Sequence, residues 1–149
     1  MQKILIDGTE TTEKVVNIDD SKVEVIFNEE KFQIYGTNNE ILIFQNNRNL
    51  RIYGDDNSIS IKGNESNLNI YGDFLNVILE NNNCNLHIYG DFNKVLVKNN
   101  NCNLHIYGTH NDVVIEKGEA VTYGYYGSTT IFDEAQANVY GNYKNFNQA

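Results

Sequence analysis

The sequence predicts an all-β protein, a parallel β-solenoid whose 18-residue coils each contain two short strands. The tripeptide Ile-Tyr-Gly occurs five times, each copy eighteen positions after the one before, from residues 34–36 to residues 106–108. Apolar residues alternate with polar ones inside each repeat, as in Leu86-His87-Ile88, and a period of two is typical of strands rather than helices. Many of the 26 asparagines lie between these strands, where asparagine favours turns.

The repeat divides the chain into coils with a cap at each end. Residues 1–12 precede the repeat and are expected to form an N-terminal cap. Coils are expected over residues 13–141, beginning with a degenerate copy at residues 13–30. After Ala120 the spacing falls to sixteen and then to seventeen positions, so the register slips. The polar tail, residues 142–149, is expected to cap the other end of a single β-solenoid domain.

The two halves of each repeat also match each other at a spacing of nine, as residues 85–88 match residues 94–97. This predicts a flattened coil with two faces, so that stacked coils form two parallel sheets around one thin core. A right-handed coil is expected, because crossovers between parallel strands are almost always right-handed. The three-sided left-handed helix of hexapeptide acyltransferases has coils of the same length. It needs an apolar residue every six positions, and Lys98 breaks that pattern after Leu86 and Phe92.

At the level of architecture, the repeat resembles parallel β-roll and β-helix proteins. The calcium β-roll also has two nonapeptides per coil, with the motif G-G-x-G-x-D-x-U-x. Here the turn reads Gly90-Asp91-Phe92-Asn93, and the paired glycines are absent. One carboxylate per coil is also few for calcium, which takes about six to eight oxygen ligands. We therefore expect no metal and no cofactor.

Composition and charge exclude several kinds of partner. The net charge of −9 disfavours direct binding to nucleic acid or to anionic membranes, and it leaves a basic protein partner open. No apolar run reaches the roughly 18 residues of a transmembrane helix. Residues 1–7 are too short and too soon charged for a signal peptide. A cytoplasmic protein is expected.

No arrangement of residues points to catalysis. The sequence contains no P-loop, dinucleotide-binding glycine motif, nucleophile elbow or HExxH, and repeated identical acids do not supply the unlike groups of an active site. We expect no enzymatic activity. Cys84 and Cys102 precede inward leucines by two residues, so they are expected to point inward as free thiols. His87 and His105 are expected outward, and two histidines are too few for structural zinc.

The most regular outward feature is a column of tyrosines, one per coil. It predicts an aromatic ladder that stabilises the sheet, a protein-binding face, or both. A flat aromatic strip could also stack sugars or unpaired bases. The residues are Tyr35, Tyr53, Tyr71, Tyr89 and Tyr107, followed by Tyr123 and Tyr140.

A second outward column is apolar. It contains Leu42, Ile78, Leu96 and Val114, with Ser60 interrupting it. Large exposed apolar patches usually mark association surfaces, and twofold dimers are the commonest oligomers. We therefore expect a homodimer contact here, unless a terminal segment such as residues 1–12 or 143–149 covers the column.

A column of acids lies at one turn of the coil, formed by Asp55, Asp73 and Asp91 with Asp56 beside it. Aspartate commonly supports a turn by hydrogen bonding to its own backbone. Evenly spaced carboxylates on a rod can also imitate the phosphates of nucleic acid. In shape and charge only, this resembles the pentapeptide-repeat solenoids that inhibit topoisomerases.

The function expected from these columns is that of a non-enzymatic interaction protein. It would self-associate as a homodimer and bind a protein partner, including a basic or nucleic-acid-binding protein, through its ladder faces. One alternative is an acidic inhibitor, of phage or mobile-element type, that occupies the nucleic-acid site of another protein. The other is a fibre subunit that stacks end to end through open strand edges.

Overall fold

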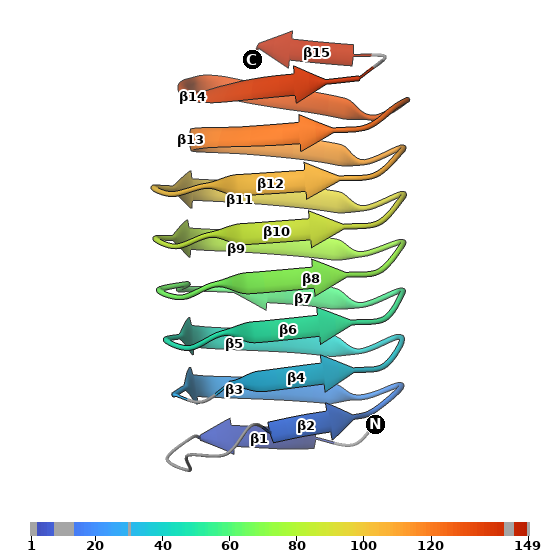
Figure 1. The fold of residues 1–149 in the computed structure, drawn as a ribbon, viewed down its shortest axis with the longest axis vertical. Helices are drawn as coiled ribbons and strands as arrows, with labels where there is room; N and C mark the ends of the chain where they lie inside the picture. Colours follow the sequence, from blue (N-terminus) through green and yellow to red (C-terminus); the bar gives the residue numbers. More distant parts are fainter. Residues whose placement is uncertain (1–2, 8–13, 30, 142–144, 149) are drawn as a thin grey trace.

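A computed structural model describes residues 3–7, 14–29, 31–141 and 145–148. Figure 1 shows flattened coils stacked along one axis, with the two chain ends at opposite ends of the stack. The even-numbered strands from β2 to β12 lie in front and run to the right, and the odd-numbered strands from β1 to β11 lie behind and run to the left. The chain rises from the bottom of the view to the top while its near strands run to the right and its far strands run to the left. The coil is therefore right-handed, as the sequence predicts. No helix in these ranges is long and apolar enough to cross a membrane.

The strands form two parallel sheets that enclose the core. Sheet 1 contains β1 (Lys3–Asp7), β3 (Lys22–Asn28), β5 (Glu40–Asn46), β7 (Ser58–Ile61), β9 (Asn76–Asn82), β11 (Lys94–Asn100), β13 (Asp112–Tyr123), β14 (Ser128–Tyr140) and β15 (Asn145–Gln148). Sheet 2 contains β2 (Lys14–Asn17), β4 (Phe32–Tyr35), β6 (Leu50–Tyr53), β8 (Leu68–Tyr71), β10 (Leu86–Tyr89) and β12 (Leu104–Tyr107). The long strands β13 and β14 run through the corner, so their C-terminal halves continue sheet 2.

The register follows the sequence repeat residue by residue. Leu86 pairs with Leu104, its counterpart in the next repeat. In sheet 1, Leu96 pairs with Ile78 on one side and Val114 on the other. Between β13 and β14 the offset shortens, as the pairs Asp112 with Ser128 and Ala120 with Ala137 show. The predicted fold class, a parallel solenoid with two strands per coil, is confirmed.

The core consists of the inward side chains of both sheets, and most of them are fully buried. Ile88 and Ile106 from sheet 2, and Val97 and Ile115 from sheet 1, have no exposed surface. Burying one such side chain stabilises the fold by roughly 1.5–3 kcal/mol. The β-branched residues fit a sheet that packs against another sheet.

Two columns of buried asparagines hold the corners of the coils together. The first contains Asn39, Asn57, Asn93 and Asn111, which are buried, and Leu75 interrupts it. In this column a side-chain oxygen accepts the backbone N–H of the coil below, as Asn111 does from Asn93 at 2.8 Å. The second column was not predicted. In it each side-chain Nδ2 donates to the next Oδ1 at 2.6–2.7 Å, and the residues are Asn28, Asn46, Asn64, Asn82 and Asn100.

The prediction that the two cysteines point inward is wrong. Cys84 and Cys102 are both partly exposed, and neither forms a disulfide. Asn82 and Asn100 occupy the inward corner positions instead. The strand alternation that leads back from Leu86 to Cys84 does not continue through the corner, because the chain bends there. The thiols are free, as expected.

The described parts of the terminal segments extend the stack. β1 pairs with β3, and β15 pairs with β14, both in parallel. Both therefore add strands to the ends of sheet 1. The cap boundaries proposed at residues 1–12 and 142–149 fall partly on residues 1–2, 8–13, 142–144 and 149, which lie outside the described residues, and they stay predictions.

Replacing Asn64 by alanine should destabilise the fold by about 2–4 kcal/mol. The change removes the acceptor of Asn46 and the donor to Asn82, and each buried polar group left unpaired costs about 1–3 kcal/mol. Asn76→Ala is the matched control, because Asn76 is exposed; a shift within about 0.5 kcal/mol is expected. Urea unfolding followed by circular dichroism measures both. Equal losses in the two variants would contradict a stabilising role for the buried column.

Candidate functional site

The tyrosine column forms one continuous stack along sheet 2. Adjacent rings lie 4.6–5.1 Å apart with interplanar angles of 4–13°, and the stack contains Tyr35, Tyr53, Tyr71, Tyr89, Tyr107, Tyr123 and Tyr140. Both faces of every interior ring are therefore covered by neighbouring rings, which leaves ring edges and hydroxyls toward the solvent. Burial, followed by the adjacent Tyr107 and Tyr71, raises the pKa of Tyr89.

This geometry decides between the uses considered for the interior tyrosines, from Tyr53 to Tyr123. A sugar or base cannot stack on a ring whose two faces are occupied. Stacked aromatic pairs contribute about 0.5–1.5 kcal/mol each beyond their burial, so the column stabilises the coils. A role in protein binding stays a prediction, and a partner would meet the hydroxyl edge of the stack.

The glycine of the Ile-Tyr-Gly motif lets the coils approach each other. Gly90 has a φ of +138°, and a Cβ added there would lie 2.0 Å from the carbonyl oxygen of Gly72. Every part of the motif thus has a physical role: the isoleucine fills the core, the tyrosine stacks outside, and the glycine permits close contact between turns.

The acid column links one coil to the next. The Oδ1 atoms of Asp55, Asp73 and Asp91 accept the backbone N–H of Asp73, Asp91 and Thr109 at 2.9, 2.7 and 2.6 Å. The expected support of the turn is therefore given to the following coil rather than to the aspartate's own backbone. Asp56 lies beside this column at the turn tip, exposed and with a φ of +57°.

A column of aromatic residues at the turn tip was not predicted. Phe74, Phe92, His110 and Tyr126 stack at 4.6–5.3 Å. All four have positive φ, which costs a residue with a side chain about 1–2 kcal/mol. Phe74 is 57% exposed and Phe92 is 47% exposed. The regular spacing of Phe74, Phe92 and His110, one per repeat, was a signal that could have revealed this exposed strip.

The outer face of sheet 1 consists of three parallel rows of side chains. Its central row is the predicted apolar column with its neighbours: Glu24, Leu42, Ser60, Ile78, Leu96, Val114 and Thr130, all partly buried. The first row is Lys22, Glu40, Ser58, Asn76, Lys94, Asp112 and Ser128. The third row is Ile26, Phe44, Lys62, Glu80, Lys98 and Glu116, and it ends at Phe132, where the register between β13 and β14 shifts.

Charges alternate in sign along the third row. Lys98 Nζ lies 3.8 Å from Glu80 Oε1, and Lys62 Nζ lies 4.8 Å from the centre of the Phe44 ring. Among the described residues, neither Lys62 nor Glu116 forms an ion pair. The face therefore combines an apolar centre with charges of both signs.

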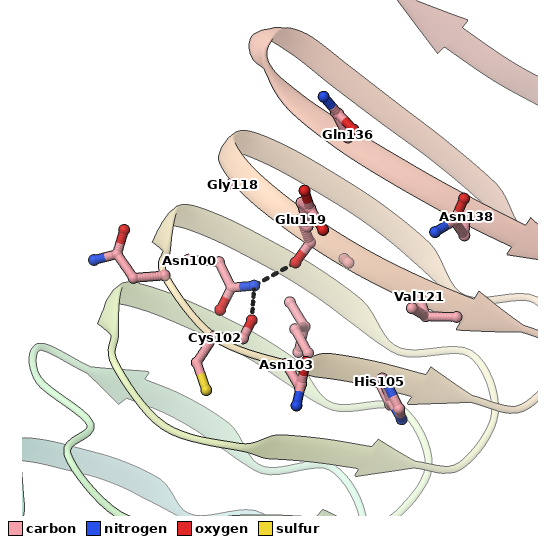
Figure 2. Close-up of a pocket in the computed structure, with 12 residues that line it drawn as sticks. Asn100, Cys102, Asn103, His105, Gly118, Glu119, Val121, Gln136 and Asn138 are labelled. Atoms are coloured by element: carbon pink, nitrogen blue, oxygen red, sulfur yellow. Dashed lines mark hydrogen bonds between the residues drawn. The ribbon is translucent and has the colours of Figure 1, made fainter.

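A pocket of about 400 Å³ opens where the second asparagine column ends. β13 continues without a break around the corner at Gly118, where a Cβ would lie 1.9 Å from the carbonyl oxygen of Asn100. Figure 2 shows the Nδ2 of Asn100 donating instead to the carbonyl oxygens of Cys102 and Glu119. The change from asparagine to glycine and the shortened corner together create this hollow.

The pocket lining offers hydrogen-bonding groups without a nucleophile beside a base. Cys102 Sγ lies 3.5 Å from Asn85 Oδ1 in the preceding coil, and His105 Nδ1 lies 3.1 Å from Tyr107 Oη. Figure 2 shows the sulfur pointing away from His105. Among the described residues, no group of three or more His, Cys, Asp or Glu side chains could hold a metal ion.

Comparison with known proteins finds no matching family model, no matching curated protein and no matching solved structure. The functional conclusion therefore depends on the surfaces described above.

Replacing Asp73 by asparagine should leave stability nearly unchanged, whereas alanine should cost about 1–2 kcal/mol. Asparagine keeps the oxygen that accepts the Asp91 N–H, and a hydrogen bond of this kind contributes about that much. Urea unfolding of the two variants checks the difference. If both variants lost the same stability, the bond between coils would not be the reason for the acid column.

Acid should destabilise the protein partly through His87. Burial, with a smaller effect from the neighbouring His105, lowers the pKa of His87 below 6.5 in the folded state. The unfolded chain then binds more protons, so the stability contributed by neutral His87 is present above pH 6.5 and is lost as pH falls through the folded pKa. The melting temperature of the His87→Asn variant should therefore fall less than that of the wild type between pH 7.5 and pH 5.5. Equal losses would contradict this assignment.

Proposed function

We propose that this chain is a non-enzymatic interaction protein that self-associates through the outer face of sheet 1. The observation that carries the proposal is the position of the terminal strands. On the sequence alone, a terminal segment covering the apolar column was an alternative. In the structure, β1 and β15 instead continue the stack at its two ends. Leu42, Ile78, Leu96 and Val114 thus remain on a face that no described segment crosses.

Repeated surfaces support binding rather than catalysis. A solenoid places similar side chains at similar positions on successive coils, whereas an active site needs unlike groups in one cavity. The pocket at Gly118 has its thiol and imidazole hydrogen-bonded to other partners. The hydroxyl edge of the tyrosine column and the exposed Phe74 and Phe92 are further surfaces for a protein partner.

The two alternatives have weaker support. Nucleic-acid mimicry would rely on the acid column, but one oxygen of Asp55, Asp73 and Asp91 is already used to hold the next coil. Assembly into a fibre would use the outer edges of β1 and β15, and it would show as a mass that grows with concentration and time.

Replacing Leu96 by glutamate should weaken the self-association at least about tenfold. The change puts a charge in the centre of the apolar column, where it loses water in the complex. Size-exclusion chromatography with light scattering, over about a hundredfold range of concentration, measures the mass. A wild-type dimer and a monomeric variant are expected.

Val15→Glu is the matched control, because Val15 is an exposed apolar residue on sheet 2. It should leave the dimer intact. A wild-type protein that stays monomeric at every concentration, or a dimer equally stable in the Leu96→Glu variant, would refute the proposed surface.

A further inference from the structure

We propose that the outer face of sheet 1 binds a second copy of this chain in antiparallel orientation, about a twofold axis between the layers of Ile78 and Leu96. The axis runs parallel to the strands, so the two rods point in opposite directions. This inference rests on the proposed function and adds to it the orientation and the register of the contact.

Such an axis sets each row of the face against the same row of the second copy, in reversed order. In the central row, Ile78 then faces Leu96 of the second copy, Ser60 faces Val114, and Leu42 faces Thr130. Ile78 and Leu96, the apolar side chains nearest the middle of the central row, thus meet each other twice. This is the self-complementary arrangement that a twofold contact requires.

The third row carries the strongest argument. About the same axis, Lys62 faces Glu116 of the second copy, and Glu80 faces Lys98. The aromatic rings of Phe44 and Phe132 meet at both ends of this charged segment. Every charge in the third row therefore faces its opposite, and the row has this property because its signs alternate about its midpoint.

The other symmetric arrangements bring like charges together. An axis along the rod would set Lys94 against Lys98 and Asp112 against Glu116 in the same layers. An antiparallel axis through the layer of Leu96 would set Lys98 against its own copy and Glu80 against Glu116. Like charges facing each other cost several kcal/mol in a dry contact, so both arrangements are disfavoured.

Two neighbouring antiparallel axes also pair opposite charges, but they place apolar side chains against charged ones. An axis between Ser60 and Ile78 would set Ile26 against Glu116. An axis between Leu96 and Val114 would set Phe132 against Glu80. Only the axis between Ile78 and Leu96, of these three, sets no apolar side chain against a charge.

The size of the face suits a reversible dimer. From the usual spacing of strands and residues, it measures roughly 34 Å by 20 Å. Two such faces in contact would bury roughly 1,200 Å² in total, which is at the lower end for stable protein complexes. Both copies are acidic, with a net charge of −9 each, so local pairing of Lys62 and Lys98 with acids offsets part of the overall repulsion.

Charge exchange tests the register. Lys62→Glu alone and Glu116→Lys alone should each weaken the dimer at least about tenfold, because each creates two like-charge contacts. A mixture of the two variants should form heterodimers about as tight as the wild type. In the heterodimer the unchanged Lys62 of one copy faces the unchanged Glu116 of the other, and the two substituted side chains face each other with opposite charges. Lys31→Glu, an exposed change outside this face, controls for net charge and should leave the dimer unchanged.

Thiol cross-linking tests the orientation. In a Cys84→Ser, Cys102→Ser background, Leu42→Cys and Thr130→Cys are prepared separately and treated with a short thiol-specific cross-linker. The mixture should give covalent dimers, and Leu42→Cys alone should give none, because its two copies would lie at opposite ends of the face. The folded state of each variant is checked by circular dichroism.

The outcomes separate this inference from the proposed function. If the wild type is a dimer that Leu96→Glu dissociates, but Leu42→Cys alone cross-links or the charge variants fail to restore each other, the antiparallel register is wrong and the surface stands. If the wild type is monomeric throughout, both are wrong. Restoration of the dimer by the mixed charge variants, together with cross-linking only in the mixed cysteine variants, would establish the arrangement.

Discussion

The whole structure depends on one constraint: each side chain lies directly above and below its counterpart in the neighbouring coils. A buried polar residue in such a stack has its own kind as its nearest neighbour. Asparagine suits this position because its amide both donates and accepts, and the column from Asn28 to Asn100 uses this at 2.6–2.7 Å. Stacked aspartates would repel each other there. Where glycine replaces asparagine at Gly118, the corner shortens and a pocket opens.

The same constraint acts on the surface, where it sets what each column can bind. Tyrosines stacked 4.6–5.1 Å apart cover one another's faces, so the regularity that makes them conspicuous also removes their stacking surfaces. The aspartates avoid direct contact by accepting the backbone N–H of the next coil, as Asp91 does from Thr109. Regular columns are thus explained first by the stability of the stack. A partner-binding surface is better sought where a row is interrupted or changes sign.

The repeat period was sufficient to predict both sheets, their register and the inward columns, because identical spacing in a parallel stack leaves one pairing. It did not predict the Asn64 column, since a polar residue at an inward position breaks the alternation by which strands are identified. It placed Cys84 wrongly, because alternation does not continue through a bend in the chain. The repeat period also did not predict the positive φ of Phe74 and Phe92. Asp20 and Asn38 favour that conformation at the equivalent position, whereas phenylalanine adopts it because the coil imposes it.

The alternating charges of the outer face of sheet 1 have an explanation within one chain, since stacked like charges about 5 Å apart would repel. Lys98 and Glu80 avoid this repulsion, because they carry opposite charges 3.8 Å apart. Avoiding repulsion, however, requires only that neighbours differ in sign. It does not require aromatic residues at equal distances from the middle, as Phe44 and Phe132 are, or the apolar Ile78 and Leu96 on both sides of that midpoint. A row whose aromatic ends match and whose charges oppose one another on reversal, beside an apolar centre, has the properties of a twofold contact.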